Sequence, residues 1–276
     1  MANALFLHPY YSDLGTITAS TTASGLATSY LQTADPSRKW RSTSITTQWI
    51  GIDLGSALAA TSLALIGGNL TSAATWKIGA SNTNVATARS APSLTAVTAG
   101  TSAWIGSKTS NPAWAQHINF AKWANSTGYR YWAIDPTDAG NADGYFEFGR
   151  LMLGVYWQPT LNVDQNVAIS WMSADPQERT PYNKLMVDRR GNVARQFDLQ
   201  FSSVDQDECE DGASELARLR GNGGDFLFCL DPEHTTRFPQ WSAQCVFGSG
   251  VRKDGVPIFL NSKQCWAYRA TLLELV

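Results

Sequence analysis

The segment from Arg195 to Pro232 constrains the fold more than any other part of this sequence, because it reads as strand, helix, strand. From residue 196 to residue 201, polar and apolar side chains alternate, which is the period of a strand with one buried face. In residues 206–220, apolar side chains recur every three or four positions and predict one buried helix face, formed by Cys209, Ala213, Leu216 and Leu219. Residues 226–230 then predict a second, buried strand.

Both ends of this helix carry capping signals. Asp205 is placed to cap the N-terminus, with Glu208 three residues later in the capping-box position. Arg218 and Arg220 lie in the last turn, where positive charge suits the helix dipole, and Gly221 supplies a left-handed stop. The segment contains no phosphate-binding loop and no nucleophile motif, so we interpret it as a structural unit.

The composition favours an all-β protein. Only 16% of the 276 residues are charged, while small polar residues are abundant and 11 Trp are present, which suits many turns and aromatic core positions. The net charge of −2 indicates no specific attraction to nucleic acid or anionic membranes. No run approaches the roughly 18 apolar residues of a membrane span. Because the N-terminus also lacks a secretory signal, we expect the protein to be made and folded in a cytoplasm.

Short strands separated by Gly-, Asn- and Asp-rich turns indicate a β-sandwich in the first part of the chain. The predicted strands are residues 49–54, 63–66, 75–80, 129–135 and 145–153. The stretch Gln158-Pro159-Thr160 marks the expected boundary to a second β-rich part. We therefore predict two domains: a jelly-roll β-sandwich over residues 1–158, and a β-barrel over residues 159–276 that carries one short α-helix at 206–220.

The first domain resembles the discoidin-like, galactose-binding-like jelly rolls found in coagulation-factor C modules and many carbohydrate-binding modules. The matching stretches are residues 34–36, Trp40, residues 49–55 with the pattern W-x-x-x-D-L-G, and residues 80–82, 129–132 and 149–151. The resemblance implies a jelly roll that binds sugars, lipids or proteins through the loops at one rim.

A basic cluster around Trp40 is the candidate ligand site at that rim. Arg38, Trp40 and Arg41 would contact a sugar or a phosphate there, because an indole ring and flanking guanidinium groups suit such ligands. The alternative is that Trp40 packs beneath the sheet and that the arginines are solvated turn charges.

The second domain resembles the split-barrel-plus-helix module of phage tail tube and distal tail proteins. Its matching parts are an R-x-F-x-L-x-F strand, an acidic-started helix, a strand ending in Asp-Pro and a final strand with L-x-E-L, at residues 195–201, 208–220, 226–232 and 266–275. In the usual distal tail protein the ring-forming barrel comes first and the galactose-binding-like domain second. The order in this chain is the reverse.

This second resemblance implies a structural virion protein in the tail tip of a long-tailed bacteriophage. A siphophage distal tail or baseplate ring protein would assemble with itself, in a sixfold or alternatively a threefold ring, and contact the tail tube protein and the tail hub or tip protein. The jelly roll would dock tail fibres or touch a glycan on the host surface. The alternative function is a carbohydrate-binding module or receptor-binding adhesin.

Charged residues of the second domain are the candidate oligomer interface. They are Arg189 and Arg190 in a predicted hairpin turn, and Glu215 and Arg218 on the helix. Charge that faces only solvent is the alternative for the turn.

Four cysteines, Cys209, Cys229, Cys245 and Cys265, lie in the last quarter of the chain. No CxxC pair is present, so the spacing signals no local zinc or iron–sulfur site. Their neighbours are largely apolar, and we predict buried free thiols. A disulfide, or an iron–sulfur cluster held by these four residues, is the alternative.

The sequence carries no catalytic constellation, so we expect no enzymatic activity, no metal and no other cofactor. His8, His117 and His234 are far apart and lack metal-ligand neighbours. The acidic residues at 205–211 sit at a solvated helix start, not in the apolar pocket that a glycosidase acid needs.

Overall fold

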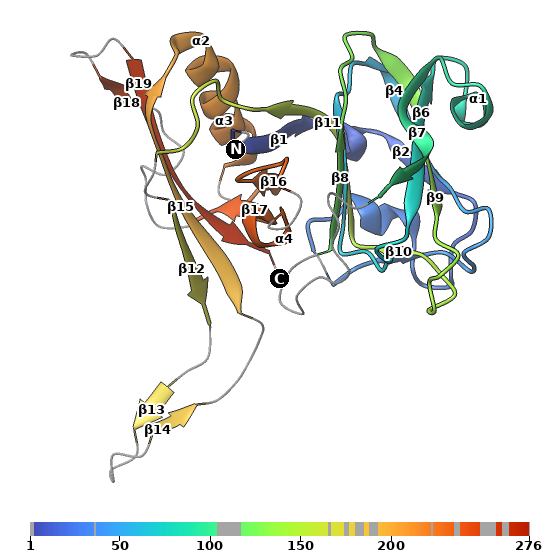
Figure 1. The fold of residues 1–276 in the computed structure, drawn as a ribbon, viewed down its shortest axis with the longest axis horizontal. Coiled ribbons are helices and arrows are strands. Elements are labelled where there is room, and N and C mark those ends of the chain that lie inside the picture. The colour runs from blue at the N-terminus through green and yellow to red at the C-terminus, as the bar shows by residue number, and fades with distance from the viewer. Residues whose placement is uncertain are drawn as a thin grey trace. The chain divides into compact units, whose positions relative to one another are not determined.

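The structure is a computed structural model. It describes residues 3–35, 37–103, 117–164, 167–173, 177–179, 185–187, 193–221, 223–234, 238–248, 258–260 and 265–275. Strands dominate these residues and helices are short, which confirms the all-β fold class (Figure 1). The chain forms two compact units: residues 1–160 with 225–244, and residues 161–224 with 245–276.

The first unit is a jelly-roll sandwich of antiparallel strands. One sheet has the order β2 (Thr16–Ala19), β4 (Ile50–Leu58), β9 (Tyr129–Thr137), β6 (Thr75–Ser81), β7 (Leu94–Ser102). The strands of the facing sheet follow the order β16 (Phe226–Cys229), β1 (Leu5–Tyr10), β11 (Arg150–Trp157), β5 (Ser62–Ile66), β8 (Ile118–Lys122). The remaining elements are a ladder of β3 (Trp40–Arg41) with β10 (Glu147–Phe148), and the short helices η1 (Ser12–Leu14), η2 (Thr28–Gln32), α1 (Val85–Ser90) and α4 (Phe238–Trp241).

The core between the sheets follows from the alternation of side chains along the strands. Ile50, Ile52 and Leu54 of β4 point inward, as do Trp76 and Ile78 of β6, and all five are buried. The facing strands β5 and β11 supply alternate leucines to the same cluster. Each large side chain buried in this way contributes about 1.5–3 kcal/mol, so the core holds the sandwich together.

Two strand boundaries differ from the sequence prediction. The strand predicted at 145–153 is divided into β10 and β11, which belong to different ladders. The division falls at Gly149, whose amide hydrogen-bonds Ile66 of β5. The strand that starts near Trp49 does not end at Gly55 but continues to Leu58, because Gly55 takes a positive φ of 74° and forms an irregularity within the ladder.

Residues 225–244 belong to the first unit, whereas the sequence analysis assigned them to the second domain. The reason is that β16 pairs with β1, with Leu5 opposite Cys229 and Leu7 opposite Leu227. Phe238 of α4 stacks on Phe120 of β8, with ring centroids 6.3 Å apart. The predicted strand–helix–strand segment is therefore not one compact unit, because its returning strand bonds to the N-terminal strand.

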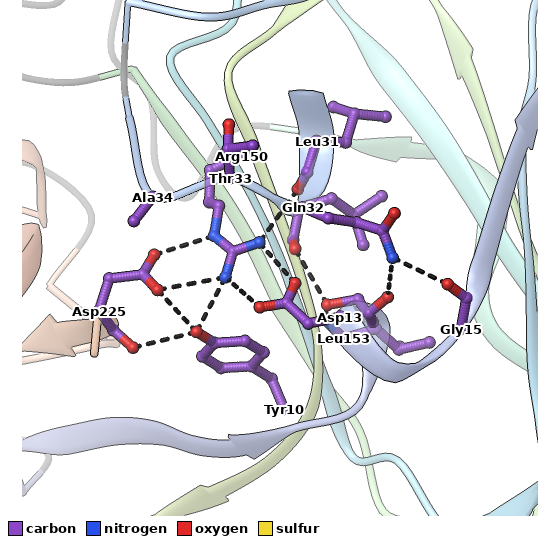
Figure 2. A network of polar contacts seen from close by, with 12 residues as sticks. Tyr10, Asp13, Gly15, Leu31, Gln32, Thr33, Ala34, Arg150, Leu153 and Asp225 are labelled. Carbon is purple, nitrogen blue, oxygen red and sulfur yellow. Dashed lines mark hydrogen bonds and ion pairs between the residues drawn. The ribbon is translucent and has the colours of Figure 1, made fainter. Parts of the chain in front are cut away.

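A buried polar network fixes this returning segment in the first unit (Figure 2). The guanidinium of Arg150 is fully buried and donates to both oxygens of Asp225, at 2.9 and 3.2 Å, and to both oxygens of Asp13, at 2.6 and 2.7 Å. The hydroxyl of Tyr10 donates to Asp225 at 2.6 Å, and Gln244 donates to the same carboxylate at 2.8 Å. The network joins segments that are far apart in sequence.

The second unit is built on two long strands that lie side by side (Figure 1), β15 (Ala194–Val204) and β19 (Cys265–Glu274). On the other side of β15 lies β12 (Ala168–Met172), while β18 (Ile258–Leu260) and the end of β17 (Ser242–Phe247) pair with β19. A separate short ladder joins β13 (Gln177–Arg179) and β14 (Leu185–Val187). The chain end is thus tied into a sheet, as its pattern indicates.

The interior of this unit contains an ion pair between Arg195 of β15 and Glu274 of β19. Both side chains are completely buried. The Arg195 Nε donates to Glu274 Oε2 at 2.8 Å, its Nη2 donates to Oε1, and its backbone amide donates to Oε2 at 3.0 Å. The Arg of the R-x-F-x-L-x-F pattern and the Glu of the L-x-E-L pattern are therefore partners in space.

The predicted helix at 206–220 is present as three successive segments, α2 (Gln206–Glu208), the π-helical η3 (Cys209–Ser214) and α3 (Glu215–Arg220). Asp205 occupies the N-cap position, but its side chain makes no capping bond, so the predicted capping box is wrong. Cys209, Ala213 and Leu216 are buried as expected. Leu219, also predicted to be buried, is 45% exposed because the inward-facing stripe ends one turn earlier. Across the part of the chain that the structure describes, no helix is long and apolar enough to cross a membrane.

Cys209, Cys229 and Cys245 are buried free thiols, as predicted. Burial raises the pKa of each thiol, in the case of Cys229 to about 12, although Ser242 donates a hydrogen bond to its sulfur at 3.0 Å. Cys265 lies in β19, and its side chain is outside the described residues.

These three thiols are expected to resist modification in the folded protein. At pH 8 each is protonated and screened from solvent, so its reaction with a thiol reagent requires local or global unfolding. We expect labelling on the order of 100-fold slower in buffer than in urea. Peptide mapping of the labelled chain checks this, and rapid native labelling of two or more of the three would contradict the structure.

Candidate functional site

The surface of the first unit carries a hollow with a volume of about 280 Å³. It is lined by the loop at residues 45–48, the start of β6, the end of α1, residues 99–100 of β7, and residues 135–137 of β9. We call this hollow the β6–β9 pocket.

Cross-strand pairing sets the polar floor of the β6–β9 pocket. Lys77 of β6 lies directly opposite Asp135 of β9, and Thr75 lies opposite Thr137. Directly opposed residues project from the same face of a sheet, so these four side chains form one group. The alternating Trp76 points the other way into the core and is buried.

Arg89, at the end of α1, closes one side of the pocket. Its Nε donates to Asp135 Oδ1 at 2.6 Å, and its guanidinium carbon lies 5.1 Å from the centre of the Trp49 ring. Helix α1 is fixed by Asn84, whose side chain accepts a bond from the amide of Thr87 at 2.8 Å. The backbone carbonyl of Arg89 also accepts a hydrogen bond from Lys77 Nζ, so the helix end and the sheet are joined.

The loop at residues 45–48 contains a strained residue. Thr47 has φ of 54°, and among the described residues it is the one non-glycine with a positive φ. A β-branched side chain makes this conformation cost about 1–3 kcal/mol. The buried Gln48 holds the loop: its carbonyl oxygen accepts from Ser20 and Thr21 at 2.5 and 2.6 Å. Strain held by such a network is typical of a functional loop.

The pocket has the chemistry of a binding site for a polar molecule. Within the described chain, the hydroxyls of Thr75 and Thr137 and the second oxygen of Asp135 have no hydrogen-bond partner. These groups accept and donate, as vicinal hydroxyls of a ligand require. The described lining residues include no His, Cys, Ser or Glu.

The three predicted rim residues do not line the β6–β9 pocket. Trp40 is fully buried and stacks on Phe148 with centroids 6.1 Å apart, so the prediction that its ring contacts a ligand is wrong. Arg41 forms an ion pair with Glu147 at 2.5 Å. The exposed Arg38 faces Asp35 at 3.5 Å. Trp40 is buried because β3 pairs with β10, which brings the two rings together in the core.

Of the predicted interface residues, Glu215 and Arg218 form an ion pair with each other on the helix, at 2.6 Å. The Arg218 side chain is largely exposed, and their role in assembly stays a prediction. Arg189 and Arg190 lie outside the described residues.

Among the described residues, no three His, Cys, Asp or Glu side chains converge on a point that could hold a metal ion. The cysteines that this statement covers are Cys209, Cys229 and Cys245.

The pocket residues were not among the sequence predictions. Lys77 and Asp135 alternate with buried positions in two predicted strands, which indicates that both face outward. Their juxtaposition depends on the register between β6 and β9, and no local pattern gives that register. Arg89 and Thr47 carry no local signal at all.

A scan of the chain against protein-family models finds no match, and a search of curated proteins finds none. Among solved structures, the chain is similar to chitosan-binding module 1 of a chitosanase/glucanase from Paenibacillus sp. IK-5, with 20% identity and a TM-score of 0.39 over 53% of this chain and 98% of that one. It is also similar to the family 32 carbohydrate-binding module of C. perfringens NanJ, solved with galactose, with 16% identity and a TM-score of 0.40 over 55% and 98%. A third similar structure is the lectin domain of lectinolysin, complexed with Lewis b antigen, with 13% identity and a TM-score of 0.37 over 53% and 96%.

Proposed function

We propose that this chain is a glycan-binding protein without catalytic activity, and that its first unit binds a sugar in the β6–β9 pocket. The observation that carries the proposal is the group formed by Lys77, Arg89 and Asp135 with the two facing threonines. Carboxylates and guanidinium groups fixed on a rigid sheet recognise hydroxyl pairs with defined geometry, because each donor and acceptor is held in place before the ligand arrives.

The size of the pocket agrees with this proposal. Its volume of about 280 Å³ lies just below the roughly 300–1,000 Å³ range of small-molecule pockets, which suits a terminal sugar better than a long polymer. The pocket also provides apolar surface from Ile45 and Ala99, on which a sugar ring can lie.

Asp135→Asn is expected to weaken glycan binding about tenfold or more, because the variant loses a charged acceptor and the partner of Arg89. The full chain is first screened on a glycan array, and the affinity of the best ligand is then measured by titration calorimetry for both proteins. Arg41→Gln, which removes a surface ion pair outside the pocket, is the control and is expected to bind like the parent. Equal affinities of the Asp135 variant and the parent would contradict the proposal that the sugar binds in the β6–β9 pocket.

A second candidate function concerns the second unit. We propose that it attaches the glycan-binding unit to a larger assembly, as a ring component in the tail tip of a long-tailed bacteriophage. In this proposal the protein is part of the virion and contacts the tail tube and the tail hub. The observation that favours it is the pairing of Arg195 with Glu274, which joins the two sequence patterns that resemble tail tube proteins.

If the second unit assembles in this way, we expect the full chain to form a ring of six copies, or alternatively three, as its concentration is raised. Light scattering coupled to size exclusion measures the mass of the full chain over a range of concentrations, and negative-stain images give the symmetry. A monomer at the highest soluble concentration, with or without purified tail tube protein, would contradict the ring and leave the glycan-binding proposal standing.

A further inference from the structure

The charges around the β6–β9 pocket do not cancel. Its described lining includes two cations, Lys77 and Arg89, and one anion, Asp135. One positive charge therefore remains after the ion pair between Arg89 and Asp135 is counted. On the basis of the proposed glycan-binding function, we propose that the pocket selects a sugar that carries an acidic group, such as the carboxylate of a uronic or sialic acid.

Arg89 has the geometry for this role. Its guanidinium donates a hydrogen bond to the protein through Nε, which bonds Asp135 Oδ1. Within the described chain its two terminal nitrogens have no hydrogen-bond acceptor. These two nitrogens form the edge of a planar group, and a planar carboxylate accepts two parallel hydrogen bonds from such an edge. Stacking over Trp49 holds the plane of the guanidinium in position.

Lys77 supplies the uncompensated charge. Its ammonium group has three hydrogens, and the structure gives it one described acceptor, the carbonyl of Arg89. This bond holds Nζ close to the end of α1 without neutralising it, because the acceptor is an uncharged carbonyl. The remaining hydrogens and the charge are available to an anion.

A neutral sugar would leave part of this set unused. Its hydroxyls satisfy Asp135 and the two threonines, but a hydroxyl meets only one donor from a guanidinium edge. A charge-assisted bond is about twice as strong as a neutral one, so an acidic group gains more from Arg89 and Lys77 together. The pocket is open to solvent, so this gain is expected to depend on salt.

The experiment compares matched sugars on the full chain. Methyl galactoside with methyl galacturonide, and methyl glucoside with methyl glucuronide, differ only in the acidic group. Methyl sialoside and a glycan array of neutral and acidic ligands extend the set. We expect the best acidic ligand to bind at least about tenfold more tightly than its neutral counterpart at low salt, and this preference to shrink as salt is raised.

Lys77→Gln tests the charge selection directly. The variant is expected to lose most of the acidic preference, because the glutamine fills the position without carrying a positive charge. Arg38→Gln removes a positive charge from the exposed rim outside the pocket and is the matched control, which should keep the preference.

The outcomes distinguish the failure of charge selection from the failure of glycan binding. Equal binding of acidic and neutral sugars, or a preference that Lys77→Gln leaves unchanged, would overturn charge selection and leave glycan binding intact. Absence of binding to every neutral and acidic ligand of the array would overturn both proposals.

Discussion

Replacing Glu274 with glutamine is expected to lower the free energy of unfolding by about 3–5 kcal/mol. The carboxylate is completely buried, and it pairs with an Arg195 side chain that is equally buried. The variant leaves the guanidinium charge in the interior without an anionic partner, and water cannot reach it. Urea unfolding followed by circular dichroism measures the loss, and hydrogen exchange should show that protection falls first in β15 and β19.

A double variant distinguishes the cost of an unpaired charge from the value of the pair. Arg195→Met with Glu274→Leu replaces the pair by apolar side chains of similar size, and most of the lost stability is expected to return. Glu215→Gln, which breaks an ion pair on the exposed helix, is the control and should change stability far less. If Glu274→Gln costs no more than that control, the buried pair is not a main support of the second unit.

Replacing Asp225 with asparagine is expected to destabilise the first unit by about 1–3 kcal/mol and to release residues 225–244. The substitution removes one of the two carboxylates that Arg150 faces, while Asp13 stays in place, and Tyr10 and Gln244 lose a charged acceptor. Hydrogen exchange of β16 and limited proteolysis measure the release. Intact protection of β16 in the variant would contradict the role assigned to the network.

The same network makes stability depend on acid. Burial alone would raise the pKa of Asp225, but the charge and hydrogen bonds of Arg150 outweigh it and hold this pKa below the ordinary value. The contribution is therefore fully present above the unfolded pKa of about 3.9 and is lost as the pH falls through the lower folded pKa. Thermal unfolding is measured at several pH values from about pH 5 down to about pH 2. The unfolding temperature should fall more steeply with pH in the parent than in Asp225→Asn.

The sequence predicts local structure well where the role of a residue depends on residues close to it in the chain. Alternation in residues 196–201 correctly predicts the strand β15, and the spacing of Cys209, Ala213 and Leu216 correctly predicts a helix with one buried face. Residues 225–244 were assigned to the wrong unit, because the partner of β16 is the distant β1. Which strands pair across long distances in the chain is not encoded in the local pattern of a single sequence, so the unit to which β16 belongs follows only from its pairing with β1.

The buried charges and the pocket also depend on contacts between segments that are far apart in the sequence. Arg150 and Asp225 read as ordinary surface charges until the fold brings them together, and Trp40 reads as a rim aromatic until it meets Phe148. The β6–β9 pocket depends on a strand register and on a strained loop, neither of which has a local signature. Functional sites assembled from several strands are therefore visible only after the fold is known.

The central claim is that a sugar binds in the β6–β9 pocket. A crystal structure of the full chain with the tightest glycan from the array tests it most directly. We predict a sugar ring over β6 and β9, with hydroxyls of the sugar within hydrogen-bond distance of Asp135 and its acidic group facing Arg89 and Lys77. A well-ordered ligand at the rim beside Arg38 and Arg41, with the pocket filled only by water, would contradict it.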